Sequence, residues 1–239
     1  MRIIEEAVAT DQRSLSEFLS KRFLAYYGIP VCKESLVQSE QDAVEEARRI
    51  GFPVVLKVCG AKLAHKTERN LIRLWLRGSD DVLKAYRDLT WCDPELVEGI
   101  LVQEMVPGHR EMVIGFTRDP HFGPCVMFGF GGMFTEVIND VSFRLAPVEE
   151  RDAMEMMHEI RSKRILESFR GEKAVDTGLL AESLVTLGRI GIENPLIREI
   201  DINPMKFRDG KPVAVDALVI LEENAAQLKS EGRTPVRCS

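Results

Sequence analysis

The sequence lacks a paired-cysteine pattern. Its five cysteines are an odd number, and none of them forms a CxxC pair. Disulfide frameworks and zinc clusters normally show regular cysteine spacing, so the sequence favours neither. We expect reduced thiols, as in proteins of the cytoplasm.

The chain also lacks an excess of basic residues and any long apolar run. It has 32 Lys and Arg against 38 Asp and Glu, for a formal net charge of −6. Nucleic-acid-binding domains are usually basic, so we expect no nucleic-acid partner. No stretch approaches the length of a membrane-spanning helix, so we expect no membrane partner. With 239 residues, 45% of them hydrophobic, the chain can bury a core, and its length suits one large or two small lobes.

Patterns typical of helices and strands are mixed along the chain without strict strand–helix–strand repetition. This mixture predicts an α+β fold. We place one part at residues 1–98, a second at 99–222 and a polar tail at 223–239. Helices are expected at 14–27 (from a capping-box pattern, Ser14–Glu17), 39–50, 79–89, 149–169 and 179–190. Strands are expected at 29–37, 52–58, 71–77, 99–106, 111–117, 124–128, 134–147, 195–204 and 211–221.

Lys57 interrupts the apolar strand Phe52–Val58. Burying an ammonium is costly unless an anion accompanies it. A nucleotide phosphate is one such anion, and the alternative is an edge-strand lysine that faces water.

Oxygen-bearing side chains recur near the end of the chain. Glu199, Asp201 and Asn203 alternate along one expected strand, so they share a face. Asp216 would lie beside them if the last two strands form a hairpin with its turn at residues 208–210. Such ligands suit Mg²⁺, which also binds phosphate oxygens. The alternative is a solvent-facing polar edge.

Three further segments carry residues that could contact a nucleotide. His65 lies in a cationic loop and could carry a phosphoryl group. Glu104, followed by Met105–Val106 and a Pro-Gly turn, could present backbone groups to a flat base, and Glu111 could reach a ribose. The glycines of 129–132 would let N–H groups approach phosphates. The alternatives are a surface histidine, an ordinary hairpin and a plain turn.

Taken together and in order, these segments resemble a known family. The run LAHKT, the strand VQEMVPGHREMVIGFTRDPHFGP, the loop FGFGG, the phrases EVINDVSFRLAP and SFRG, and EIDINPM with a following VDA resemble the ATP-grasp beta subunit of ADP-forming acyl-CoA synthetases. That family includes the ADP-forming acetate–CoA ligases and is related to succinyl-CoA synthetase. The resemblance covers about residues 10–221.

The resemblance implies an ATP-grasp fold of two lobes with ATP/ADP and Mg²⁺ bound between them. It implies that Lys57 binds the phosphates and that Asn203 and Asp216 carry Mg²⁺ with Glu199 or Asp201 nearby. The other implied nucleotide-binding residues are Glu104, Met105 and Val106 around the adenine, Glu111 at the ribose, and Gly129, Gly131 and Gly132 over the phosphates.

The implied reaction converts acyl-CoA, ADP and phosphate into a carboxylic acid, CoA and ATP. A CoA-binding alpha subunit, expected in an α2β2 assembly, makes the acyl phosphate, and His65 relays the phosphoryl group as a phosphohistidine. After LAHKT this sequence reads Glu68–Leu71, where the family usually has two glycines, and Asn139 stands where a lysine is common. The alternatives are therefore a non-catalytic regulatory subunit that binds nucleotide, or another ATP-grasp carboxylate ligase.

Overall fold

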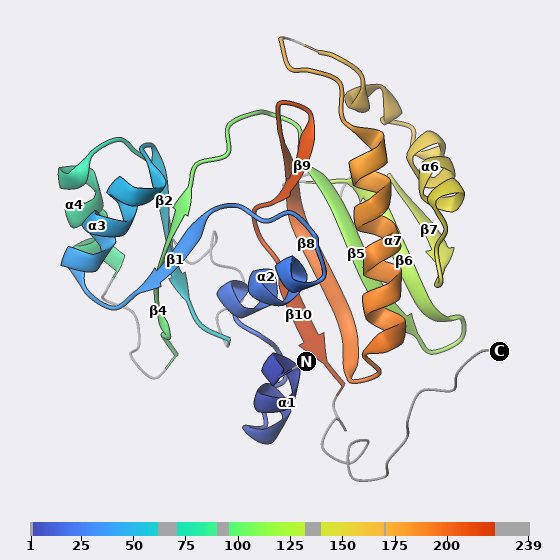
Figure 1. Ribbon diagram of the computed structural model, residues 1–239, viewed down its shortest axis with the longest axis horizontal. Helices are drawn as coiled ribbons and strands as arrows, with labels where there is room; N and C mark the ends of the chain where they lie inside the picture. Colours follow the sequence, from blue (N-terminus) through green and yellow to red (C-terminus); the bar gives the residue numbers. More distant parts are fainter. Residues whose placement is uncertain (1, 62–70, 90–95, 132–139, 170, 223–239) are drawn as a thin grey trace. The chain divides into compact units, whose positions relative to one another are not determined.

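The computed structural model describes residues 2–61, 71–89, 96–131, 140–169 and 171–222 (Figure 1). The chain divides into two compact units, each made of more than one segment. The larger unit comprises residues 1–14, 20–31 and 108–239, and the smaller unit comprises residues 15–19 and 32–107. The expected division at residue 98 differs from this one because the next strand, Gly99–Glu104, pairs inside the sheet of the smaller unit.

The smaller unit is an antiparallel sheet with the strand order β1-β4-β2-β3. Helices α3 and α4 pack on one face of it, where Ala43 and Val82 share a core with Leu56 and Val102 (Figure 1). The bounds are β1 Glu34–Val37, α3 Glu40–Ile50, β2 Val54–Cys59, β3 Ile72–Leu76, α4 Ser79–Leu89 and β4 Gly99–Glu104.

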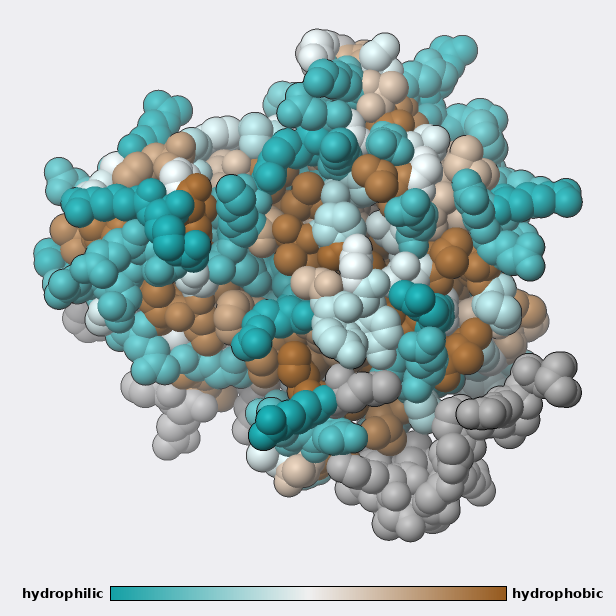
Figure 2. Space-filling model, viewed as in Figure 1, coloured by the Kyte–Doolittle hydropathy of each residue, from teal (hydrophilic) through white to brown (hydrophobic). Residues whose placement is uncertain are grey.

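Helix α3 shows how local sequence sets these elements. The Ser39 hydroxyl accepts the N–H of Asp42 at the start of the helix, and Gly51 ends it with a φ of 100°. Both ends agree with the sequence prediction. The outer side of the helix carries the exposed Glu45 and Arg48. Figure 2 shows many hydrophilic residues at the left of the view, where this helix lies in Figure 1.

The larger unit is a six-stranded antiparallel sheet. Its order is β10-β8-β5-β6-β7, and β9 pairs with one end of β8. With the smaller unit, this confirms the α+β class. The bounds are α1 Arg2–Ala9, α2 Glu17–Tyr26, β5 Met112–Asp119, β6 Gly123–Phe130, β7 Val141–Leu145, α6 Glu150–Glu159, the 3₁₀ turn η1 Lys163–Leu166, α7 Thr177–Glu193, β8 Ile197–Arg208, β9 Lys211–Ala214 and β10 Leu218–Leu221.

Helix α7 covers one face of this sheet (Figure 1). A Cβ added at Gly191 would lie 1.9 Å from the ring of Phe116, and one at Gly188 would lie 3.3 Å from Val126. Glycine at these positions lets the helix approach the strands closely. Residues that alternate with Phe116 along β5, such as Thr117, point to the opposite face, called here the site face.

The N-terminal segment departs from the sequence prediction in two places. Residues 2–9 form the helix α1, which we did not predict, and α2 begins at Glu17. Ser14 pairs in a β-bridge with Ile220, so the predicted capping box at Ser14–Glu17 is wrong. No helix in the described part of the chain combines the length and apolar character that a membrane crossing requires.

Candidate functional site

Lys57 lies in β2, between β4 and β3 in the smaller unit. Its side chain is 5% exposed, which contradicts the interpretation as an edge lysine facing water. Its Nζ atom lies 2.7 Å from Oε1 of Glu17, whose side chain is 1% exposed. The buried ammonium therefore has an anionic partner within the protein.

The segment predicted to frame an adenine follows the end of β4. The Glu104 carboxylate accepts the backbone N–H of Lys33 at 2.7 Å. The Met105 N–H donates to the Pro53 carbonyl at 3.1 Å, and Val106 is buried. The Met105 N–H already has a hydrogen-bond partner. The other backbone groups of residues 104–106 are therefore the better candidates for contacts with an adenine base.

Glu111, the predicted ribose contact, immediately precedes β5 in the larger unit. Its carboxylate lies 3.2 Å from the ammonium of Lys206 on β8. The Lys206 side chain is 12% exposed and that of Glu111 is 34% exposed. Lys206 thus holds the Glu111 carboxylate in place, and this carboxylate is still accessible to solvent.

The glycines predicted to form a loop are arranged differently. Gly129 lies inside β6, paired with Val113 and Val141, so its assignment to a loop is wrong. A Cβ on Gly129 would lie 2.6 Å from a Val141 methyl carbon, and one on Gly131 would lie 2.5 Å from the Met112 carbonyl carbon. Packing alone requires glycine at both positions. Gly132 lies outside the described residues.

The acidic residues of β8 share the site face, as predicted. Ile200 and Ile202 are buried, whereas Glu199, Asp201 and Asn203 are half-buried. The pKa of Asp201 is raised from 3.8 to about 6, first by burial and then by the negative charges of Glu199 and Asp216. Burial and two neighbouring negative charges thus both disfavour the ionised form of Asp201.

Asp216 reaches this group from an irregular segment. The predicted strand 211–221 is two strands, β9 and β10, and the break between them, residues 215–217, contains Asp216. The Val215 N–H donates to the Pro204 carbonyl, and the buried Lys21 ammonium donates to the Val215 carbonyl at 3.2 Å. The predicted hairpin turn is correct: Asp209 and Gly210 form it, both at positive φ.

A bulge in β8 explains why Lys206 was missed. Ile202 pairs with Ile114 and Met205 pairs with Met112, so three steps along β8 match two along β5. Simple alternation places Asn203 and Lys206 on opposite faces, whereas the bulge brings both to the site face. The sequence analysis did not identify Glu17 as the partner of Lys57, because the pattern Ser14–Glu17 predicted a helix cap there.

The oxygen-bearing side chains of this group would suit Mg²⁺. In the part of the chain that the structure describes, no three His, Cys, Asp or Glu side chains form a ready-made metal cluster. Mg²⁺ usually needs only one or two carboxylates, because water and substrate phosphates complete its coordination. Asp201, Asn203 and Asp216 are oxygen ligands of the suitable kind, and a cation would offset the negative charges that act on Asp201.

His65, the predicted phosphoryl carrier, lies outside the described residues, as do Glu68, Arg69, Asn70 and Asn139. Its role stays a prediction. The structure therefore presents two groups of candidate residues, one in each unit: Lys57 with Glu17 and the segment 104–106 in the smaller unit, and the acidic group with Lys206 and Glu111 in the larger unit.

Known proteins resemble this chain over most of its length. The ATP-grasp domain family matches residues 6–221. Subunit beta of the ADP-forming acetate–CoA ligase I of Pyrococcus furiosus is 39% identical over 224 residues, which cover 92% of this chain and 96% of that protein.

Solved structures agree. The dinucleotide forming acetyl-coenzyme A synthetase 1 of Ca. Korarchaeum cryptofilum, in complex with coenzyme A, Ca-AMPCP and HgCl+, gives a TM-score of 0.88 at 42% identity, with 92% of this chain and 99% of that chain covered. A second structure of that enzyme, with coenzyme A and Mg-AMPPCP, has its phosphohistidine segment pointing towards the nucleotide binding site. It gives a TM-score of 0.82 at 41% identity over the same shares of the two chains.

Proposed function

Because this chain belongs to the ATP-grasp family of beta subunits of ADP-forming acetate–CoA ligases, we propose that it is the nucleotide-binding subunit of an acid–thiol ligase. The reaction interconverts acyl-CoA, ADP and phosphate with a carboxylic acid, CoA and ATP. The observation that supports this proposal most directly is the half-buried Asp201, which alternates with the buried Ile200 and Ile202 on β8 and shares the site face with Glu199 and Asn203. A buried carboxylate beside other negative charges is costly unless a cation is bound.

Each unit contributes residues to this function. In the smaller unit, the Lys57 ammonium binds a nucleotide phosphate, and the segment 104–106 binds the adenine. In the larger unit, Glu111 binds the ribose, and Asp201, Asn203 and Asp216 hold Mg²⁺, with Glu199 farther along the strand. Packing already accounts for glycine at Gly129 and Gly131, so of the three predicted glycines Gly132 keeps the proposed role of letting the backbone approach the phosphates. When bound, Mg²⁺ neutralises charge on the phosphate oxygens.

Phosphoryl transfer needs positioning and charge neutralisation more than covalent chemistry by the protein. Lys57 supplies a fixed positive charge, and His65 accepts the phosphoryl group and passes it to ADP as one N–P bond breaks and one O–P bond forms. We propose that a CoA-binding alpha subunit makes the acyl phosphate and that the two chains form an α2β2 assembly. Cys32, Cys59 and Cys125 are buried and form no disulfide within the described part of the chain, which supports our proposal of a cytoplasmic location.

The reaction is tested by mixing the purified chain with acetyl-CoA, ADP and phosphate. We expect no ATP from the chain alone and ATP formation once the CoA-binding partner is added. ATP formed without a partner would contradict the assignment as a subunit. A chain that binds Mg·ADP yet supports no ATP formation with its partner would favour the regulatory alternative.

The relay is tested with labelled ATP and the partner subunit. We expect an acid-labile, alkali-stable label on this chain and none on the His65→Ala variant. Unchanged turnover of His65→Ala would instead favour a ligase that joins a carboxylate to an amine, because that chemistry does not use a histidine carrier.

A further inference from the structure

The smaller unit contains a buried ion pair that the predicted nucleotide contacts do not include. The Glu17 carboxylate and the Lys57 ammonium are 2.7 Å apart, and their side chains are 1% and 5% exposed. Glu17 belongs to residues 15–19, the short N-terminal stretch that joins the smaller unit. Forty residues of sequence separate the two charges.

The sheet fixes where the Lys57 stem lies. Leu56 and Val58, its neighbours in β2, pack into the core under α3 and α4. Because side chains alternate across a strand, Lys57 projects from the opposite face of the sheet. β4 and β3 flank β2, with Lys57 opposite Leu101 and Ile72. The ammonium is therefore held at its base by the sheet and at its end by Glu17.

Fold stability alone does not explain such a pair. Removing two charges from water costs several kcal/mol per ion, and apolar side chains of similar size often stabilise a core better. A single buried ammonium without its carboxylate would be worse still, because the negative charge of that carboxylate would no longer offset its desolvation. The arrangement makes sense where a positive charge must stay fixed in a place largely shielded from water.

We propose that Glu17 is the positioning residue of Lys57. It offsets the desolvation of the ammonium and fixes its direction, so that Lys57 meets the nucleotide phosphates without first reorienting. This inference rests on the proposed function, since it assigns Glu17 a role in phosphate binding through Lys57. Glu17 itself does not touch the nucleotide.

The test compares the affinities of the full chain for Mg·ADP and for adenosine by calorimetry. We expect Glu17→Gln to weaken Mg·ADP binding about tenfold while adenosine binding changes less than twofold, because adenosine has no phosphates. Lys57→Met should weaken Mg·ADP binding by at least as much. The double variant should be no weaker than Lys57→Met alone, because the two residues act as one unit.

Glu46→Gln is the matched control. Glu46 is a partly buried acid of the same unit, bonded to Ser35 at 2.6 Å and to Arg49 at 2.6 Å. Its replacement should leave both affinities unchanged. Glu17→Asp, which keeps the charge and shortens the reach, should fall between the wild type and Glu17→Gln, and it carries the test if Glu17→Gln does not fold.

If the wild type binds Mg·ADP, three results would overturn the role of Glu17 without affecting the proposed function. These are an unchanged or tighter Mg·ADP affinity in the Glu17 variants, an equal loss of adenosine affinity, and a double variant whose loss is the product of the two single losses. A wild-type chain that binds neither Mg·ADP nor Mg·ATP would instead overturn the proposed function itself.

Discussion

At the scale of single residues, the surroundings give two carboxyl groups opposite properties. Burial and the charges of Glu199 and Asp216 raise the pKa of Asp201 to about 6. Hydrogen bonds from Arg144 and then Ser142 lower the pKa of Glu159 to about 2. Among the described residues, only negative charges and burial shift the pKa of Asp201, whereas the guanidinium of Arg144 acts on Glu159, so Asp201 is where a cation would be bound most favourably.

Asp201→Asn should stabilise the metal-free chain at neutral pH. The folded chain holds the Asp201 proton more tightly than the unfolded chain does, so the carboxyl costs stability as the pH rises from about 4 through about 6. We expect a gain of about 1–2 kcal/mol in unfolding free energy at neutral pH and none below about pH 4. Denaturant titrations at several pH values, with EDTA present, measure it.

The exposed Asp209, which pairs with Lys173 on the surface, supplies the control. Asp209→Asn should change the unfolding free energy by less than about 0.5 kcal/mol at each pH, as expected for an exposed pair. A loss of stability in Asp201→Asn at neutral pH would show that the three carboxylates do not repel one another.

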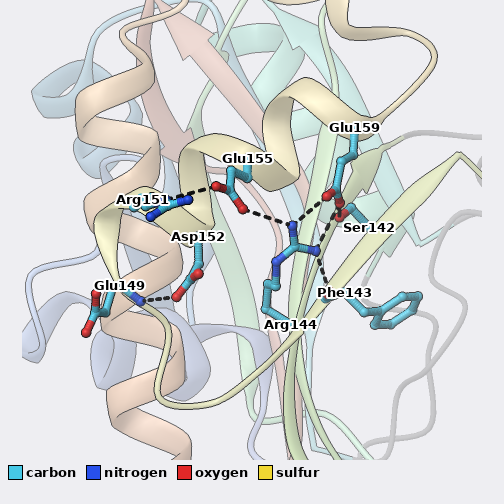
Figure 3. Close-up of polar contacts among 8 residues, drawn as sticks. All are labelled: Ser142, Phe143, Arg144, Glu149, Arg151, Asp152, Glu155 and Glu159. Carbon is cyan, nitrogen blue, oxygen red and sulfur yellow. Dashed lines mark hydrogen bonds and ion pairs between the residues drawn. The ribbon is translucent and has the colours of Figure 1, made fainter.

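At the scale of secondary-structure elements, short polar contacts fasten the helices to the larger sheet. Figure 3 shows Arg144 of β7 beneath Glu155 and Glu159 of α6. The guanidinium donates to both Glu159 oxygens, at 2.9 and 2.6 Å, and Ser142 donates to the same carboxylate at 2.6 Å. These bonds join the edge strand to the helix that follows it.

Glu159→Gln should weaken this link in a pH-dependent way. The pKa of Glu159 is lower in the folded chain than in the unfolded chain. The ionised carboxylate therefore stabilises the fold above about pH 4.5, and this stabilisation is lost as the pH falls towards about 2. The Glu159 side chain is 49% exposed, so we expect a loss of no more than about 1 kcal/mol at neutral pH. Glu155→Gln should lose less, because Glu155 lies 3.7 Å from Arg144. If Glu159→Gln lost as much unfolding free energy near pH 2 as at neutral pH, the stabilisation would not come from the charge of Glu159.

Gly191→Ala should destabilise the packing of α7. The added methyl group would overlap the Phe116 ring, and overpacking of this kind costs about 1–3 kcal/mol. Gly178→Ala, in the same helix, is the control, because its Cβ would meet only an Asp176 oxygen at 3.4 Å. That variant should be neutral or gain up to about 1 kcal/mol. Thermal unfolding of the two variants compares them directly.

At the scale of the whole molecule, a chain of net charge −6 must bind an anion. Long-range attraction does not favour a nucleotide here, so fixed local cations and Mg²⁺ have to supply the positive charge. We propose Lys57 and Lys206 as two such cations, and each already lies beside a carboxylate. Nucleotide affinity should therefore depend strongly on the metal.

Mg²⁺ and ADP together should raise the melting temperature more than either does alone. At a nucleotide concentration about 100 times the dissociation constant, binding adds about 2.7 kcal/mol to the unfolding free energy. EDTA should remove most of this gain, and Asp216→Asn should reduce it. Differential scanning fluorimetry measures each condition. An ADP-induced shift that EDTA leaves unchanged would contradict the metal's role.

The sequence by itself determined the α+β class, most helices and strands, the bounds of α3, the turn at Asp209–Gly210 and the shared face of Glu199, Asp201 and Asn203. These features depend on local periodicity and backbone preference, which a sequence carries directly. The order of its motifs also gave the family.

Only the tertiary structure decided the rest. The β8 bulge, the partners of Lys57 and Glu111 and the break that carries Asp216 arise from contacts between segments far apart in the chain. Gly129 was predicted to lie in a loop because glycine is common in loops. Glycine is also required where a strand packs closely against its neighbour, and Gly129 is such a case. Local sequence does not encode which distant backbone or charge lies beside a residue, and those neighbours determine whether a buried charge is stable.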